Sequence, residues 1–224
     1  MTNPPATRRV VLAVEEAGIS DRLLAFATSL CDLRQLPLLA QLRLEPGLDT
    51  AAHLAFVSLV DRGGSAWRDW LPKDADQSRA RILARWQRRL QTIAVEKDFE
   101  TEITARKCSR REQLKDLIAS GDFIVMSSSR AAPEFGLTSG RIRILTMESA
   151  TEVTQVAREV CERLGARPEF AVAKALHDLS VRVTTAKVAE TILVLARESL
   201  VAADIPALCA FLRERGRGLV IVPG

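Results

Sequence analysis

The sequence has no tyrosine, and aromatic residues make up only 4% of its 224 residues. The hydrophobic share is nevertheless 47%, so the core must consist mainly of Val, Leu, Ile and Ala. These side chains fill the buried strands of α/β proteins. The chain is long enough to bury such a core as one large domain or as two domains of about 100 residues each.

Metal-binding motifs are also missing. The chain has four cysteines and two histidines, and no two cysteines form a CxxC pair. We therefore expect neither a zinc site nor a His-based metal site, since scattered cysteines are typical of small buried side chains in a reducing compartment. A Cys–His nucleophile, formed by His177 with Cys161 or Cys209, stays open as a catalytic alternative.

The sequence contains no long hydrophobic run. No stretch approaches the roughly 18 apolar residues of a membrane span, and MTNPPATRRV at the start lacks the apolar segment of a signal peptide. We expect a cytoplasmic protein without membrane insertion.

Known catalytic motifs are absent as well. There is no Gly-x-Ser-x-Gly elbow, no HExxH and no Walker loop, so we do not expect an enzyme. An acid/base pair made of Glu15-Glu16 and Glu148 stays open, as does weak ATP hydrolysis.

Positive charge is not concentrated in one half of the chain. The net charge is +4, with 20 basic and 18 acidic residues in 1–140 and 12 basic and 10 acidic residues in 141–224. Nucleic-acid-binding domains usually gather basic residues on one face or in one segment. This balance argues against a nucleic-acid partner.

Hydrophobic patterning predicts alternating strands and helices in the first half. The predicted strands span 10–14, 37–46, 99–108 and 122–128. Three helices are predicted: one that begins at Ser20-Asp21, one over 77–95 and one over 109–120. The last helix opens with the capping-box pair Ser109 and Glu112 and ends at Gly121. This alternation predicts a parallel sheet with helices on both faces.

Residues 47–76 interrupt the alternation. They contain a Gly63-Gly64 break, with Trp67 and Trp70 close to Pro72. We predict an insertion or lid over one end of the sheet, because long connections in compact domains are often functional. The simpler alternative is that the two tryptophans pack this loop onto the protein.

The second half repeats the opening of the chain. Residues 141–164 align with 8–33 after a deletion of three residues, and Glu148 then matches Glu15. The matched apolar pairs are Leu23 with Val153, Phe26 with Val156, Ala27 with Ala157, Leu30 with Val160, and Cys31 with Cys161. Beyond them the pattern predicts a helix over 169–179, strands over 180–188 and 192–199, a helix over 204–216 and a strand over 218–224. We infer domains 1–140 and 141–224, the second a shortened copy.

Strand VVLAVE, a long helix and FETEITARKCSRREQLKDLIASGDFIVMSSSR together resemble the universal stress protein family over residues 9–130. The segment ending ILVLARES…FLRERGRGLVIVPG resembles a second, divergent copy. The resemblance implies an α/β fold of two flavodoxin-like units, each with a five-stranded parallel sheet flanked by helices, paired within one chain as single-copy members pair as dimers. It also implies that the terminal strand GLVIVPG makes the pairing contact.

Nucleotide-binding members of that family carry a G-x2-G-x9-G-(S/T) loop after the fourth strand. The resemblance places Ser127, Arg130, Gly140 and Arg141 at its four defined positions, so only one of them is kept. Glycines let the backbone approach the phosphates closely, and a side chain at position 127 blocks that approach. We therefore expect that standard ATP binding is lost.

A divergent nucleotide site is the alternative. Arg130 and Arg141 suit phosphate, and Ser127 and Ser128 offer hydroxyl donors. Glu15 stands where the family carries an acidic residue and could accept a hydrogen bond from a ribose hydroxyl. The ligand would then be ATP or AMP and the protein a stress sensor.

The predicted helix 77–95 has a basic face, made of Arg81, Arg85, Arg88 and Arg89, and an apolar stripe, made of Ile82, Leu83, Trp86 and Leu90. A basic face beside an aromatic residue can bind nucleic acid or an acidic membrane. The simpler reading is a solvated face that pairs with nearby acids such as Asp74 and Asp76. We rank an acidic protein partner first among the functional readings.

These features together predict a tandem universal-stress-protein-like α/β protein that acts as a regulatory or protein-interaction module. Standard ATP binding is not expected, and association into a homodimer is left open. The alternatives are the ATP or AMP sensor and an enzyme of the wider nucleotide-α-hydrolase-like fold group.

Overall fold

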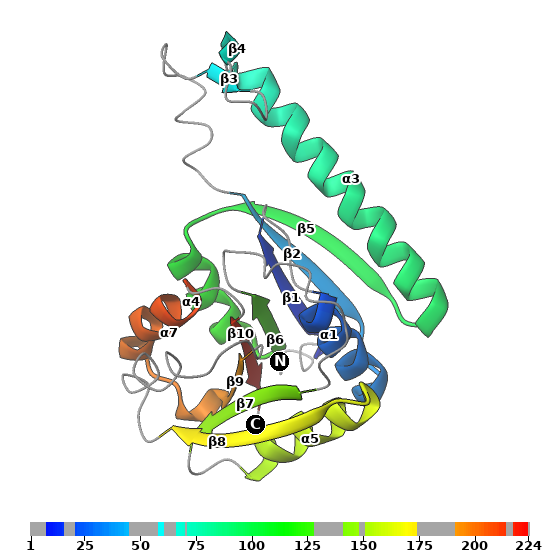
Figure 1. The fold of residues 1–224 in the computed structure, drawn as a ribbon, viewed down its shortest axis with the longest axis vertical. Helices are drawn as coiled ribbons and strands as arrows, with labels where there is room; N and C mark the ends of the chain where they lie inside the picture. Colours follow the sequence, from blue (N-terminus) through cyan, green and yellow to red (C-terminus); the bar gives the residue numbers. More distant parts are fainter. Residues whose placement is uncertain are drawn as a thin grey trace, which may run out of the picture.

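The computed structural model is an α/β protein built around one eight-stranded sheet (Figure 1), which confirms the predicted fold class. The structure describes residues 8–15, 21–44, 58–60, 66–69, 71–127, 141–147, 151–173, 191–213 and 217–223. The strands of the main sheet are β1 (Val10–Glu15), β2 (Leu38–Leu44), β5 (Thr101–Lys107), β6 (Phe123–Ser127), β7 (Arg141–Met147), β8 (Arg167–Ala173), β9 (Thr191–Ala196) and β10 (Arg217–Val222). The helices are α1 (Asp21–Arg34), α3 (Pro72–Lys97), α4 (Arg110–Ser120), α5 (Thr151–Arg163) and α7 (Ile205–Phe211).

The sheet has the strand order β5-β2-β1-β6-β10-β9-β7-β8. Neighbouring strands are parallel except β10 and β6, which are antiparallel. Strand β10, which contains most of GLVIVPG, therefore joins the strands of the first half to those of the second. On either side of it the first strand of a half, β1 or β7, lies between its second strand and a later one.

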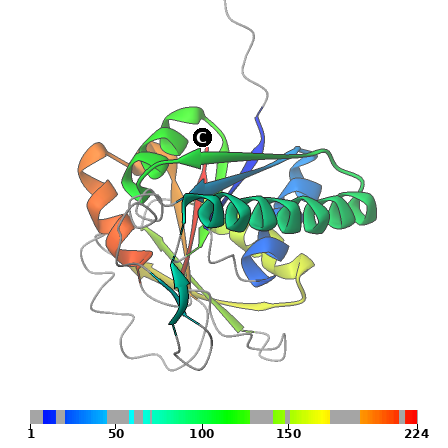
Figure 2. The same ribbon diagram turned by 90° about the horizontal axis from the view of Figure 1, so that it is seen from above.

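Helices cover both faces of the sheet. Helices α1, α3 and α5 pack on one face and α4 and α7 on the other, as Figures 1 and 2 show. Helix α1 contacts α5, and α4 contacts α7. Each of these helix pairs combines one helix from each half of the chain, so neither half buries its helices without the other.

The two halves also share local geometry. The sequence alignment of the two halves matches five apolar residues of α1 with five of α5, and all ten of these residues are buried. Helix α1 and helix α5 are each followed by a residue with positive φ, Gln35 at 53° and Gly165 at 61°. The next backbone N–H then donates to the carbonyl of a buried cysteine over 3.0 Å in both places, Leu36 to Cys31 and Ala166 to Cys161. The resemblance implied five strands in each unit, whereas the described residues of each half contribute four to the sheet.

The predicted helix over 169–179 is wrong where the structure describes it. Residues 167–173 form the edge strand β8, which pairs with β7 along its full length. The apolar residues of RPEFAVA fit either a helix or a strand, so the pairing with β7 decides the outcome. The predicted strand over 180–188 lies outside the described residues.

Helix α3 is longer than predicted and begins at Pro72. Proline suits the first turn because the backbone N–H groups of that turn have no hydrogen-bond partner within the helix, so the N–H that proline lacks is not missed. Asp74 accepts a hydrogen bond from the backbone N–H of Leu71 over 2.9 Å and so caps the start. Residues 72–76 therefore belong to the helix rather than to the predicted insertion.

The remainder of the predicted insertion contains a separate antiparallel pair, β3 (Ser58–Val60) and β4 (Ala66–Asp69). Figure 1 shows this pair near the N-terminal end of α3. Trp67 lies in β4, and Trp70 lies outside the described residues. The role of a lid over the sheet stays a prediction.

The contact between β10 and α1 leaves no room for a side chain at Gly218. A Cβ at this position would lie 2.6 Å from Cδ2 and 3.2 Å from Cγ of Leu23, and Leu23 is 1% exposed. Gly218→Ala should therefore lower the free energy of unfolding by about 1–3 kcal/mol, as measured by urea denaturation. In a Leu23→Ala background the same change should cost clearly less, because the clashing atoms are gone. Equal costs in the two backgrounds would contradict this packing.

Candidate functional site

A buried charged cluster lies at the carboxyl ends of β1 and β2. Glu15, the last residue of β1, is in register with Arg43 of β2. Val11 and Ala13 pack beneath α4 and α7, so alternation along the strand places Glu15 on that same face. Arg43 Nη2 lies 3.2 Å from Glu15 Oε1, and the two side chains are only 7% and 8% exposed.

Arg110 brings a second guanidinium group to the same carboxylate. It is the first residue of α4, directly after the N-cap Ser109, whose predicted capping box with Glu112 is confirmed. Its Nη2 forms an ion pair with Glu15 Oε1, and its Nη1 donates to the carbonyl of Leu212 over 2.8 Å. Burial lowers the pKa of Arg110 below its ordinary value. Glu15, Arg43 and Arg110, here called the Glu15 cluster, thus combine two cations with one anion.

A second polar contact fixes α4 above these strand ends. Gln41 precedes Arg43 by two residues and lies on the same face of β2. The Gln113 side-chain amide of α4 donates to Gln41 Oε1 over 3.1 Å, and Gln113 is only 1% exposed. The N-terminal turn of α4 is therefore positioned by its cap, by the Glu15 cluster and by this amide pair.

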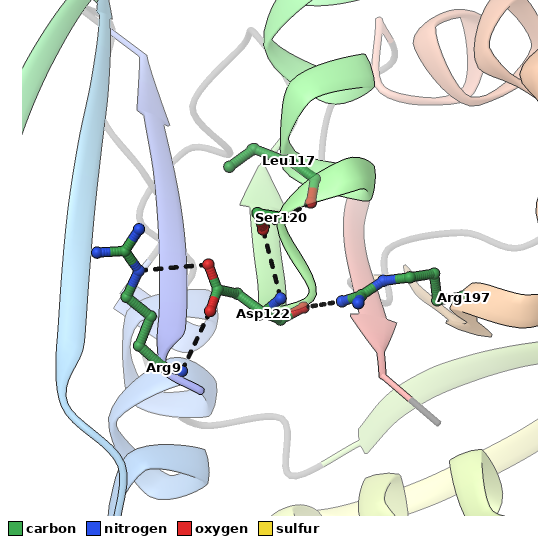
Figure 3. A network of polar contacts seen from close by, with 5 residues as sticks. All are labelled: Arg9, Leu117, Ser120, Asp122 and Arg197. Carbon is green, nitrogen blue, oxygen red and sulfur yellow. Dashed lines mark hydrogen bonds and ion pairs between the residues drawn. The ribbon is translucent and has the colours of Figure 1, made fainter. Parts of the chain in front are cut away.

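A second polar network lies at the amino ends of β1 and β6, opposite to the ends that carry the Glu15 cluster (Figure 3). The backbone N–H and the Nε of Arg9 donate to the two carboxylate oxygens of Asp122, each over 3.3 Å. Ser120 Oγ accepts from the Asp122 N–H over 3.3 Å and donates to the Leu117 carbonyl over 2.8 Å. Arg197, directly after β9, donates through Nη2 to the carbonyl of Asp122. The network therefore joins the two halves of the chain.

Arg110 and Arg197 each donate a hydrogen bond to a backbone carbonyl just beyond the C-terminal end of a helix. Arg110 bonds a carbonyl at the end of α7, and Arg197 bonds a carbonyl just after α4. Burial lowers the pKa of Arg197 as it does that of Arg110. A cation near a helix C-terminus is favoured by the helix dipole. The Arg110 contact holds the start of α4 to the end of α7, and the Arg197 contact holds the end of β9 to the turn between α4 and β6.

The structure does not bring two of the described cofactor candidates, Glu15 and Ser127, onto one face. Both stand at the carboxyl ends of strands, and Ser127 is 4% exposed. Phe123 and Val125 belong to the apolar cluster that contains α1, so Ser127 points to the face opposite Glu15. Reaching both side chains would require a ligand to cross over the top of the sheet.

The other predicted nucleotide residues lie elsewhere or outside the described parts. Arg141 is the first residue of β7, three strand positions from β6 in the sheet, which corresponds to about 14 Å. The positions outside the described residues are Ser128, Arg130 and Gly140 of the predicted loop and the catalytic candidates Glu16, Glu148 and His177.

Helix α3 carries the predicted apolar stripe and basic face. Trp86 and Leu90 are buried, with Ile82 and Leu83 partly buried against the same cluster. Arg81, Arg85 and Arg88 are exposed. Arg89 differs from these three because it lies over the Trp86 ring at 5.4 Å and forms an ion pair with Asp21. Of the two acids predicted to pair with the basic face, Asp76 lies 3.7 Å from Arg79 and Asp74 caps the helix.

Arg43, Arg110 and Arg197 are not among the residues predicted from the sequence. Arg43 had a usable signal, because Gln41 and Arg43 alternate with apolar residues and so mark one face of β2. Arg110 follows a recognised N-cap, but its partners are distant in sequence. Arg197 follows a predicted strand without any local pattern that indicates its contact.

The described helices include none that is long and apolar enough to cross a membrane. Within the same residues, no group of three or more His, Cys, Asp or Glu side chains could hold a metal ion.

A comparison with protein-family models and with curated proteins finds no match to this chain. The resemblance to the universal stress protein family therefore stays a prediction, carried by the quoted residues.

The Glu15 cluster predicts a specific loss of stability. Glu15→Gln removes the anion between two buried guanidinium groups, so the free energy of unfolding should fall by about 3 kcal/mol, measured by urea denaturation. Glu102→Gln, at an exposed position of β5, is the matched control and should change it by less than about 0.5 kcal/mol. Equal stability of the two variants would contradict the ion pairs described here.

The cysteines should differ sharply in reactivity. Cys31 and Cys161 are fully buried, and burial raises the pKa of these thiols to about 12 and about 11. Cys108 is also buried, whereas Cys209 is partly exposed. Because only the thiolate reacts, Ellman's reagent at about pH 8 should label Cys209 first in the folded protein and all four thiols in urea. Cys209→Ser should remove the folded-state reaction, and rapid labelling of Cys161 would contradict the buried position.

Proposed function

We propose that this protein is a universal-stress-protein-like regulatory or protein-interaction module of two α/β units, 1–140 and 141–224, that does not bind nucleotide at the carboxyl ends of β1 and β2. The observation that carries this proposal is the Glu15 cluster. The acidic residue that would serve a ribose hydroxyl is already bound by Arg43 and Arg110.

The energetics of the cluster support this assignment. A carboxylate that serves a ribose must be within reach of the ligand, whereas the Glu15 side chain is only 8% exposed and its Oε1 is held by two guanidinium groups. Turning Glu15 toward a ligand would break its ion pairs with the buried Arg43 and the largely buried Arg110. Breaking a buried ion pair from one side costs about 3–5 kcal/mol, which exceeds the gain from one ribose hydrogen bond.

The arrangement of the halves supports the tandem part of the proposal. The order of strands around β1 and the positive-φ residue after α1 recur around β7 and after α5. Two helices of the first half, α1 and α4, each contact a helix of the second half, α5 and α7. If two units pair within one chain in this way, their pairing does not depend on protein concentration. A second chain is then not needed to complete the sheet.

Isothermal titration calorimetry tests the proposal. ATP and AMP at about 1 mM should give no binding heat, which corresponds to a dissociation constant weaker than about 1 mM. Arg130→Ala should leave this result unchanged. Micromolar binding that is lost in Arg130→Ala would instead establish the ATP or AMP sensor and overturn the module without nucleotide.

A further inference from the structure

Helix α3 presents one face to the protein and the opposite face to solvent. Trp86 and Leu90 are buried, and Ile82, Leu83 and Ile93 pack partly against the same cluster. These positions recur at helical spacing, so residues half a turn away point outward. Figure 2 shows α3 along the outside of the molecule, on the same side of the sheet as α1 and α5.

The outward face of α3 carries charge of one sign. From 77 to 95, every exposed position holds Arg, Gln, Ala, Thr or Val, and none holds an acid. Arg81, Arg85 and Arg88, here called the arginine stripe, follow one another at i, i+4 and i+7 and therefore line up along the helix. At 1.5 Å per residue the stripe is about 10 Å long.

No carboxylate of the described residues forms an ion pair with the arginine stripe. No acidic residue stands three or four positions from any of the three arginines. Arg88 only donates its Nε back to the carbonyl of Ala84 over 3.3 Å, which leaves its terminal nitrogens facing solvent. Elsewhere on the surface, exposed arginines do meet carboxylates, as in Arg106 with Asp116 and Arg163 with Asp32.

We propose that the arginine stripe binds an acidic helical segment of a partner protein, an inference that rests on the proposed role as an interaction module. Carboxylates at i, i+4 and i+7 on such a segment match the spacing of the three arginines. Ala84 lies within the stripe and lets a second helix approach closely. Val95, seven residues beyond Arg88 on the same side, is 86% exposed and offers an apolar contact at one end.

A helical protein segment fits the stripe better than a nucleic acid does. Acids flank the stripe toward both ends of α3, with the Asp76 side chain 78% exposed and Glu96 exposed as well. Phosphates that extend beyond the three arginines would meet mixed charge, because exposed Lys73 and Lys97 stand near these acids. Proteins that bind duplex DNA through its backbone commonly make about 6–10 phosphate contacts, whereas the stripe provides three cations.

Fluorescence anisotropy with a labelled alanine-based peptide tests this proposal. One peptide carries Glu at i, i+4 and i+7, and an isomer carries the same three Glu at i, i+2 and i+5, spread around the helix. The first should bind more tightly. Arg81→Gln/Arg85→Gln/Arg88→Gln should weaken its binding by about tenfold, since each of the three exposed ion pairs contributes about twofold to threefold. Raised salt should weaken binding of the first peptide to the unaltered protein.

The control variant is Arg111→Gln/Lys115→Gln/Arg213→Gln, which removes the same charge from exposed positions outside α3 and should change the affinity by less than about twofold. Failure of the patterned peptide to bind, equal binding of the two peptides, or an unchanged affinity in the stripe variant would overturn the proposal. Tighter, stripe-dependent binding of a duplex DNA would overturn it in favour of nucleic acid. Calorimetry with ATP tests the absence of nucleotide binding, and anisotropy with the peptides tests the arginine stripe. A failure of one proposal can therefore be distinguished from a failure of the other.

Discussion

The pairing of β10 with β6 and β9 joins the strands of the two halves into one eight-stranded sheet. The last strand of the chain runs parallel to β9 and antiparallel to β6, and its side chains enter the apolar clusters on both faces, with Val220 and Val222 in one and Leu219 and Ile221 in the other. Because α1 contacts α5 and α4 contacts α7 across this strand, separating the halves would expose both cores. Strand β10 is therefore part of the packing of both halves.

The contact between the two halves also determines which residues lie at the carboxyl ends of β1 and β2. Packing of α4 against α7 brings Arg110 within reach of both Glu15 and a carbonyl of α7. The acidic strand end then holds Arg110, which in turn contacts the second half, and in the function proposed here it does not serve a ligand. On this account a residue type that suits a nucleotide has become part of the internal structure, and the exposed chemistry of the protein lies instead on the outward face of α3.

Much of the fold could be predicted because its signals are local. The capping box at Ser109, the buried strands and the apolar stripe of α3 each depend on neighbouring residues. Strand β8 could not be predicted in the same way, because its apolar pattern fits either structure and only pairing with β7 selects the strand. At the site, Glu15 was a candidate from its position, whereas its partners Arg43 and Arg110 come from elements distant in sequence. Their meeting depends on strand register and helix packing, which no local pattern encodes.

If the Glu15 cluster takes the place of a nucleotide, ATP leaves the carboxyl ends of β1 and β2 unchanged. Hydrogen–deuterium exchange of the backbone amides, measured by mass spectrometry with and without about 1 mM ATP, tests it most directly. The account predicts that amides at the end of β1, in the first turn of α4 and in β6 exchange at the same rates in both samples. Slower exchange in these three segments when ATP is added would show that a nucleotide binds there and would contradict the account.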